Sequence, residues 1–538
     1  MKDSKYCSSQ YFFRFQSSSL KLVSLLVFLI TLSGCKTVGP DFIRPDAPVS
    51  DQWLEMDDPK VSTSQADFST WWTIFDDPVL NSLVENAYQQ NLPLQIAGIR
   101  ILEARAQLGI AVGNIYPQKQ QVRGGLGHVE ISDNQPNFSS TLDTSFRDID
   151  AGFDIGWELD LWGRFKRGIE AADADLLATI ADYDDVLVSL TAGVASAYTL
   201  IRTFEERLAI ARKNVEIQER SLEITTIRFK NGITTELDVQ QAKTLLLNTQ
   251  ASIPALEIGL QQARHALSTL LGLPPGNLEN LINSEGVIPT APAEVAVGIP
   301  AELLRRRPDT RRAELQAAAQ SARIGIAEGD LYPHFSLVGS IGLRASDTFN
   351  SNLGDLFQLN SVEAFAGPSL TWDVFNYGRI KNNVRVQDAR LQQLIVNYQN
   401  TVLEATREVE DALVGFLRAK EQVVFLAQSV ESAERSVELA LLQYRDGVAD
   451  YQRVLDTQQA LVTQQDLLTA RRGDIATFLI AMYRALGGGW EIRQGNDFVP
   501  GETKEVMKER TNWGEVLEST PSDSSGDKNI KTFPRPDW

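Results

Sequence analysis

Few residues in this sequence could do chemistry, and most of them stand alone. The three histidines, His128, His265 and His334, are scattered and lack the spacing of metal ligands. No nucleophile motif of a hydrolase occurs. The glycine run 487–489 lacks the Lys-Ser or Lys-Thr partner of a phosphate loop and predicts a helix end instead. We therefore expect no enzyme, no metal site and no cofactor.

Cys35 is the residue whose surroundings do predict a reaction. It follows a basic N-terminus, an apolar run over residues 22–32 and two small residues, which is typical of a secretory signal peptide. Its position resembles that of the lipobox cysteine, which receives an S-diacylglycerol and an N-acyl chain. We expect residues 1–34 to be removed and Cys35 to carry the lipid, with Lys36 favouring the outer membrane. The alternative is an ordinary signal peptide with an incidental cysteine.

Composition excludes some classes of function. The formal net charge of −19 argues against a nucleic-acid binder, because phosphate contacts need a basic surface. No stretch after the signal peptide has 18 uninterrupted apolar residues. Any further membrane crossing would therefore be a β-barrel.

The rest of the chain contains two copies of one large unit. The segment 157–164 matches 372–379 at an offset of 215, and the same offset relates Gly232 to Gly447. The boundaries that follow are an anchored segment at 35–76, copy one at 77–282, copy two at 283–490, and a polar tail at 491–538. We expect the tail to be disordered, since it lacks periodicity. The basic run 305–307 at the start of copy two is expected to pair with acids such as Asp309 or Glu314.

Each copy predicts a helix, two strands, a very long helix, a turn and a last helix. The first helix covers about Pro78 to Tyr116 in copy one and Asp309 to Leu331 in copy two. The very long helix of copy two has apolar residues at alternating spacings of four and three, which predict a coiled-coil seam. These residues are Ala405, Val409, Ala412, Phe416, Ala419, Val423, Leu426, Val430, Ala433, Val437, Ala440 and Tyr444. The equivalent helix, from Arg164 to Phe229, would be roughly 100 Å long.

Apolar and polar residues alternate in the segments before the long helices. Residues 153–160 and 335–344 show the pattern clearly, 122–131 shows it weakly, and Leu370, Trp372 and Val374 continue it. Pro368 is expected to mark a strand start or an irregularity. In a membrane barrel the apolar face would meet lipid and the polar face water. Four strands cannot close a barrel and eight would fill it, so three chains with twelve strands are expected.

The chain is similar to the TolC/OprM outer-membrane factor family, in its NodT-type lipoprotein branch. The similarity runs from Cys35 to Trp490, and it is carried by seven motifs. They are residues 38–45, 71–72, 75–78, 157–164, 304–309, 367–368 and 485–490. The resemblance implies an α+β membrane protein that forms a TolC-like homotrimer, with a twelve-stranded transmembrane barrel and a coiled-coil helical barrel in the periplasm. It also implies an outer-membrane efflux duct that passes small toxic compounds from a periplasmic adaptor and an inner-membrane pump to the exterior.

The resemblance places the periplasmic mouth at the two helix-turn-helix tips. Candidate adaptor-docking residues are Gly232, Leu237, Asp238 and Gly447. Candidate gate residues are Asp446, Asp450 and Arg453, where threefold repetition would make rings of charge. The alternative for these three is a solvated turn, and the family's aspartate aligns closer to Ala449 than to Asp450.

Other functions stay open at this stage. A duct for type I protein secretion or metal-ion efflux would share the same outer component. Only four methionines occur, which disfavours a copper relay. A purely structural lipoprotein would share the anchor but not the duplicated strand pattern.

Overall fold

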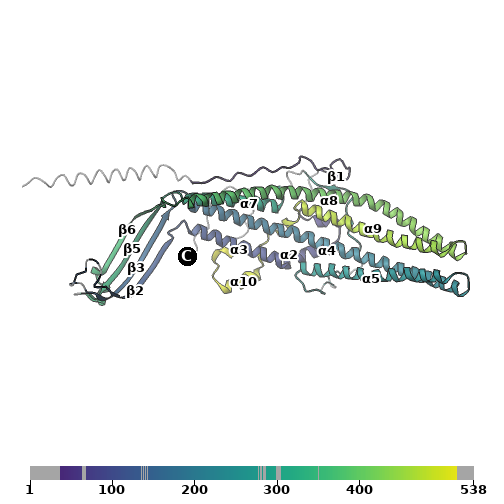
Figure 1. The fold of residues 1–538 in the computed structure, drawn as a ribbon, viewed down its shortest axis with the longest axis horizontal. Helices are drawn as coiled ribbons and strands as arrows, with labels where there is room; N and C mark the ends of the chain where they lie inside the picture. Colours follow the sequence, from purple (N-terminus) through teal and green to yellow (C-terminus); the bar gives the residue numbers. More distant parts are fainter. Residues whose placement is uncertain are drawn as a thin grey trace, which may run out of the picture.

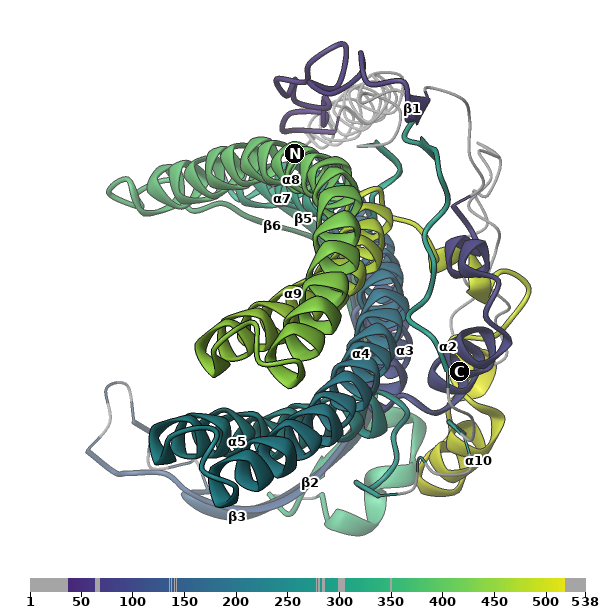
Figure 2. The ribbon, with the colours of Figure 1, turned by 90° about the vertical axis from the view of Figure 1, so that its right-hand side faces the viewer.

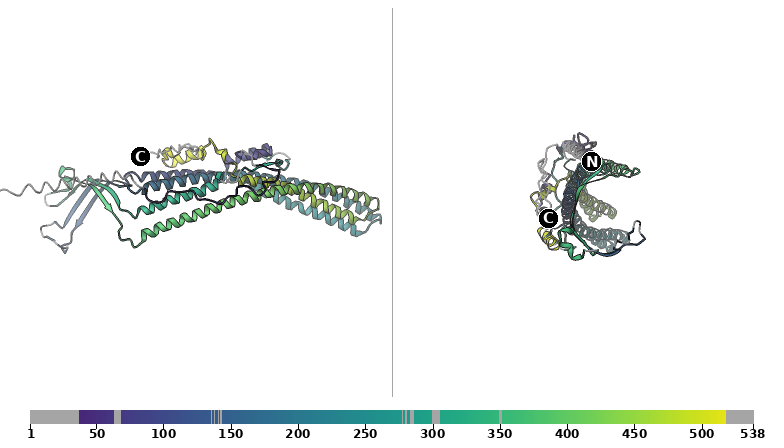
Figure 3. Two further views of the ribbon diagram at one scale, coloured as in Figure 1. Left: turned by 90° about the horizontal axis from the view of Figure 1, so that it is seen from above. Right: turned by 90° about the vertical axis from the view of Figure 1, so that its left-hand side faces the viewer.

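The computed structural model describes residues 37–62, 68–134, 136, 138–139, 141, 143–276, 278, 281–282, 286–298, 305–348 and 351–517. It is a long molecule with a β-sheet at one end and helices that run to the other (Figure 1). Seen along the long axis, the chain forms an arc that is open on one side (Figures 2 and 3). One chain therefore builds a segment of a curved wall.

Three helices of each copy correspond in length. α3 (Leu92–Gly113) and α7 (Pro308–Gly329) have 22 residues each, and α4 (Arg164–Lys230) and α8 (Arg379–Arg445) have 67 each. α5 (Glu236–Leu270) and α9 (Tyr451–Ala485) have 35 each. The duplication and the very long helices are confirmed, and 67 residues correspond to about 100 Å.

The single first helix expected in copy one is wrong, because two helices occupy that stretch. α2 (Pro78–Gln90) ends at Asn91, whose backbone is extended, and α3 starts directly after it. The Asn91 side chain accepts the Leu94 N–H at 2.9 Å, which caps α3. Pro93 has no N–H to continue the first helix, so the chain bends and starts again.

The four-stranded sheet is antiparallel and has the order β2-β3-β5-β6. Its strands are β2 (Lys119–Glu130), β3 (Ser145–Leu159), β5 (His334–Ser346) and β6 (Val362–Thr371). The expected extension to Trp372 and Val374 is wrong, since β6 ends at Thr371. Pro368 does not start a strand; it lies inside β6, an edge of the sheet, opposite Leu337. A separate two-stranded sheet pairs β1 (Val61–Ser62) with β4 (Val295–Ala296).

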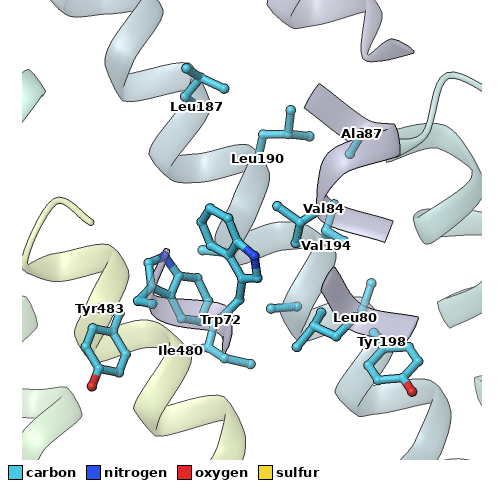
Figure 4. Close-up of a cluster of buried hydrophobic side chains, with 14 of the residues drawn as sticks. Trp72, Leu80, Val84, Ala87, Leu187, Leu190, Val194, Tyr198, Ile480 and Tyr483 are labelled. Carbon is cyan, nitrogen blue, oxygen red and sulfur yellow. The ribbon is translucent and has the colours of Figure 1, made fainter. Parts of the chain in front are cut away.

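The main core lies where α2, α4 and α9 meet the short helix η1 (Trp71–Phe75). Figure 4 shows Leu80 and Val84 of α2 beside Leu190 and Val194 of α4. Tyr483 of α9 stacks on Trp71 with ring centroids 5.5 Å apart. α4 contains a stretch apolar enough to cross a membrane, but 67% of that stretch is buried within the protein. We therefore regard α4 as a core helix.

The predicted seam is confirmed over much of both long helices, but its middle positions in α8, from Val423 to Ala433, are only half-buried, and Phe229 at the end of α4 is exposed. In α8, Ala405, Val409 and Phe416 are fully buried, and Tyr444 at the far end is buried as well. The copy-one counterparts of Ala433 and Ala440, 215 positions earlier, are Gln218 and Thr225, and both are buried in α4. At these two positions the repeat predicts burial although the residue is polar.

The prediction of a disordered tail from residue 491 is wrong for the part that the structure describes. The tail continues to Leu517 through η4 (Trp490–Arg493), α10 (Gly501–Arg510) and η5 (Gly514–Leu517). Phe498 and Met507 are buried in the main core, and Arg493 pairs with the buried Asp184. A few separated apolar residues suffice to order this part of the tail, because the helical body already offers an apolar surface on which they pack. Residues 518–538 lie outside the described residues.

Candidate functional site

Both helical hairpins turn at the end of the molecule farthest from the sheet (Figure 1). The turns contain Gly232 and Gly447, with φ angles of 69° and 76°. The next residue, Ile233 or Val448, donates its N–H to the carbonyl five residues earlier, at 2.9 Å in both turns. Left-handed glycine with this bond is a helix stop that few other residues could form.

All four predicted docking residues lie at these tips. Leu237 has 65% of its surface exposed. Asp238 has a local role, because its carboxylate accepts the N–H of Thr235 at 3.3 Å and completes the capping box of α5. Sequence reasoning missed two exposed apolar residues, Ile233 and Val448. The signal was present, since each directly follows the turn glycine in its copy.

The three predicted gate residues come together in the second turn. Asp446 lies 3.8 Å from Arg445, and Asp450 caps α9 by accepting the N–H of Arg453 at 3.3 Å. Asp446, Asp450 and Arg453 are all exposed in a single chain. Their role in closing a mouth stays a prediction.

A link between the two tips was not foreseen. Arg228 of α4 donates to the Arg445 carbonyl at 2.9 Å, and its guanidinium lies 4.7 Å from the centre of the Tyr444 ring. Tyr444 in turn packs edge-on against the buried Tyr451, with centroids 5.3 Å apart. Burial raises the pKa of the Tyr451 hydroxyl. This apolar and cation–π cluster joins the hairpin of copy one to that of copy two.

At the other end, the sheet separates apolar from charged residues. Val122, Phe153, Ile341 and Ala364 lie opposite one another in register and therefore share a face. Three of them, Val122, Phe153 and Ile341, are exposed large apolar side chains. Such a surface in a single chain indicates contact with lipid or with another chain.

Two tryptophans tie this sheet to the helices in an equivalent way. Trp157 donates its indole N–H to the Ile115 carbonyl at 2.9 Å, and Trp372 donates to the Leu331 carbonyl at 3.0 Å. Both carbonyls lie just after α3 and α7. The arrangement fixes the angle between the sheet and the helical wall in each copy.

The chain forms a curved wall, with an exposed apolar sheet face at one end and helical hairpins at the other. This arrangement fits the protein family that its sequence matches. The family described as "Outer membrane efflux protein" matches residues 83–273 and 299–488. Nodulation protein T of Rhizobium leguminosarum bv. trifolii is 30% identical over 470 residues, which cover 86% of this chain and 96% of that protein. The chain belongs to the outer membrane efflux protein family.

Two further comparisons support the assignment. "Solvent efflux pump outer membrane protein SrpC" of Pseudomonas putida is 30% identical over 485 residues, covering 88% of this chain and 100% of that protein. A solved structure of the outer-membrane channel OprN matches with a TM-score of 0.78 and 32% identity, covering 84% of this chain and 99% of that one. The predicted TolC-like α+β fold, the outer-membrane location and the efflux-channel function are confirmed.

The N-terminal segment of this efflux protein is held at the junction of sheet and helices. Val38 donates its N–H to the Trp162 carbonyl at 3.0 Å. The buried Arg167 donates to the Val38 carbonyl at 3.1 Å and to Asp41 at 2.8 Å. Cys35 itself lies outside the described residues.

The basic run 305–307 pairs as expected in part. Arg307 lies 2.7 Å from Asp309 and 3.0 Å from Glu408, whereas Glu314 pairs with Arg44 at 2.6 Å. Burial alone would raise the pKa of the Asp309 carboxyl, but the hydrogen bonds and charge of Arg307 lower it. Within the described part of the chain, no group of three or more His, Cys, Asp and Glu residues could hold a metal ion.

Proposed function

We propose that three copies of this chain close into one continuous duct, with β6 of each copy pairing with β2 of the next. The observation that carries the proposal is the repeated register of the sheet. β2 pairs with β3 so that Lys119 faces Gly156, and β5 pairs with β6 so that His334 faces Thr371. Each residue of the second pair is 215 positions after its counterpart in the first, so the duplication is preserved in the register.

The same rule gives the register of the missing seam. Within the chain, β3 pairs with β5 so that Ile155 faces Gly339. Moving Ile155 forward by 215 positions leads to Leu370, and moving Gly339 back by 215 leads to Gly124. We therefore expect Leu370 to face Gly124 of the next copy. Pairing both edges would satisfy backbone groups that cannot stay unpaired in lipid.

The helical wall supports the same closure. α4 packs on α7 in its own chain, and Ala181 of α4 is fully buried. Its counterpart on α8, Val396, has 54% of its surface exposed, and Ile96 of α3 has 52%. α8 should therefore pack on α3 of the next copy, which would bury both apolar residues.

Disulfide trapping tests this closure. Leu370→Cys with Gly124→Cys should give covalent dimers and trimers on oxidation, and no larger species. Ile155→Cys with Gly339→Cys is the matched control, since the equivalent pair should link only within one chain. Leu370→Cys with Leu126→Cys tests the register, because a shift of two residues keeps the same face. Closure is ruled out if the first pair links no chains while the control pair forms its bond.

The duct is proposed to act passively, without catalysis or a cofactor, between an inner-membrane pump with its periplasmic adaptor and the exterior. The exposed tip residues Ile233, Leu237 and Val448 offer an apolar surface for the adaptor. Relatives that are about 30% identical carry names as different as nodulation and solvent efflux, which supports a cargo chosen by the pump. Small toxic compounds are the proposed cargo. Steady conductance in a planar bilayer, with recovery of an adaptor by affinity purification, would test the duct and its partners.

The gate and the anchor complete the proposal. Asp446, Asp450 and Arg453 are proposed to narrow the periplasmic mouth, and an Asp450→Ala variant with wild-type conductance would remove that residue from the gate. Cys35 is proposed to carry the lipid. Val38 is fixed at the sheet–helix junction, and three residues span at most about 11 Å. Acyl chains on Cys35 would thus reach the membrane surface beside the barrel, and mass spectrometry of the mature protein would detect them.

A further inference from the structure

Four charged side chains gather on one face of the sheet, far from the tips. Arg123 of β2 lies 3.5 Å from Asp150 and 3.5 Å from Asp154, both on β3, and 3.2 Å from Glu363 of β6. We call these four residues the luminal belt. One guanidinium is shared by three carboxylates.

The contact between Arg123 and Glu363 crosses two intervening strands. In register, Arg123 faces Gly152, Gly152 faces Gly342, and Gly342 faces Glu363. With strands spaced about 4.8 Å apart, the outer members of this row are separated by about 14 Å. The two side chains meet because the glycines between them raise no side chain from the wall.

The glycines also hold the charges against the wall. A Cβ atom at Gly152 would lie 3.3 Å from the Arg123 Nε, and one at Gly125 would lie 2.6 Å from the Asp150 carboxylate. Residues larger than glycine at positions 125 and 152 would push these charged groups away from the sheet and into the lumen.

The register decides which way the belt faces. Val122, Phe153 and Ile341 lie on the opposite face and are exposed in a single chain. Since the apolar face of a membrane barrel meets lipid, the belt faces the water-filled interior. The Arg123 and Glu363 side chains keep 40% and 47% of their surface exposed, so passing solutes can reach them.

The charges of this region do not cancel. Besides Arg123, two described cations lie near the belt. Lys119 is 3.8 Å from Asp154, and Arg344 faces Asp150 in register and pairs with Asp148 at 3.1 Å. With Asp148 included, four carboxylates against three cations leave one net negative charge per chain.

The geometry points to the luminal belt as a charge filter in the barrel, which favours cationic solutes and is separate from the periplasmic mouth. This inference rests on the proposed function, because the belt can act only if the chains close into a conducting duct. Fixed charge on a wall raises the local concentration of oppositely charged ions and lowers that of like-charged ions. The effect should reach across the lumen at low salt and vanish at high salt.

Reversal potentials of single channels under a KCl gradient test the filter. Arg123→Gln, wild type, Glu363→Gln and Glu363→Lys form a series in which the net charge of the belt rises by one unit per step. The cation-to-anion permeability ratio should fall in that order by about 2-fold per step near 10 mM salt, where the Debye length is about 30 Å. The differences should disappear near 1 M salt, where that length is about 3 Å.

Two controls separate charge from structure. Asp154→Asn changes the belt charge by the same amount as Glu363→Gln and should give the same shift. Lys508→Gln removes one positive charge from α10, outside the barrel, and should leave the reversal potential at the wild-type value. Equal reversal potentials across a series that conducts steadily would overturn the filter and leave the duct intact. Absence of steady conductance in the wild type would overturn the proposed function, and the filter with it.

Discussion

The two copies share one backbone plan but not one environment. Ala181 and Val188 on α4 are buried, whereas their counterparts on α8, Val396 and Leu403, have 54% and 49% of their surface exposed. The α4 face is covered by α7 of the same chain, to which Arg312 and Asp185 contribute an ion pair at 3.1 Å. We infer that α8 presents the same kind of face to a neighbouring chain.

The copies also differ in whether charged residues are buried in the core. Tyr198 and Arg202 of α4 form a buried network in which Tyr198 donates to Asp77 at 2.7 Å and Arg202 donates to Glu205 at 2.8 Å. Burial raises the pKa of Tyr198 to about 12. The equivalent positions on α8 are Leu413 and Leu417, both fully buried. Gly286 of the linker between the copies lies against Arg202, where an added Cβ would collide with the guanidinium carbon.

In each copy, the residue that precedes α3 or α7 is hydrogen-bonded to the end of the last helix, and the residue type differs between the copies. Asn91 donates to the Leu270 carbonyl at 2.8 Å, and Arg307 donates to the Ala485 carbonyl. Leu270 and Ala485 are the final residues of α5 and α9. A neutral amide donates this hydrogen bond in copy one, and a charged guanidinium donates it in copy two.

Placing the buried charge of copy one at the equivalent position of copy two should destabilise the protein most. Leu417→Arg would bury a guanidinium without a carboxylate, because the residue equivalent to Glu205 is Lys420. An uncompensated buried charge costs about 4 kcal/mol, so the thermal midpoint followed by circular dichroism should fall sharply. Leu417→Met should cost less than about 1.5 kcal/mol. Equal midpoints for Arg and Met at this position would contradict the contrast between the copies.

A second pair of variants separates folding from assembly. Val188→Glu places a charge inside the chain and should cost about 3 kcal/mol, with loss of helical signal. Leu403→Glu places it on the face that we assign to the neighbour, so the single chain should keep its helices and fail to assemble. Light scattering of the detergent-solubilised protein measures the mass. Full assembly of Leu403→Glu would contradict the assignment of this α8 face to a neighbouring chain.

A third prediction concerns the hydrogen bonds that Asn91 and Arg307 make to the ends of α5 and α9. The pKa of Asp309 is lowered in the folded chain, so its contribution to stability is present above the unfolded pKa of about 3.9 and is lost as pH falls through the lower folded value. Asp309→Asn should cost about 2 kcal/mol at pH 7. Its difference from wild type should shrink below pH 4, as thermal midpoints from pH 7 to pH 3 would reveal. Asn91→Ala, which involves no titrating group, should show the same loss at every pH.

The smallest effect concerns the junction between sheet and helices. His334 lies 2.8 Å from Glu158 within the chain, and the equivalent residues at the seam are Lys119 and Asp373. Reversing one charge with Asp373→Lys should weaken assembly by about 0.5 kcal/mol, because exposed pairs contribute little. Adding Lys119→Asp should restore it. Additive losses in the double variant, measured by thermal dissociation of the trimer, would show that the two residues do not meet.

Much of this protein could be predicted from its sequence. The duplication, the seam along the long helices and the stops at Gly232 and Gly447 depend on local periodicity and on the left-handed backbone of glycine. Segments 122–131, 153–160 and 335–344 were also recognised as strands, whereas most of β6 and the short strands β1 and β4 were missed. These features are local, and each residue's neighbours in the chain decide them.

The contacts between distant residues depend on the three-dimensional fold. Arg123 and Glu363 are 240 positions apart, and their contact requires the order β2-β3-β5-β6 with two glycines in register between them. The link from Arg228 to Arg445 and the packing of Phe498 against the core are likewise long-range. Such contacts give no periodic pattern in the sequence. The position of a polar tail or a single arginine depends on the surface that other parts of the chain form. Local sequence patterns define the repeating unit, whereas long-range contacts in the fold set how the two units share one wall.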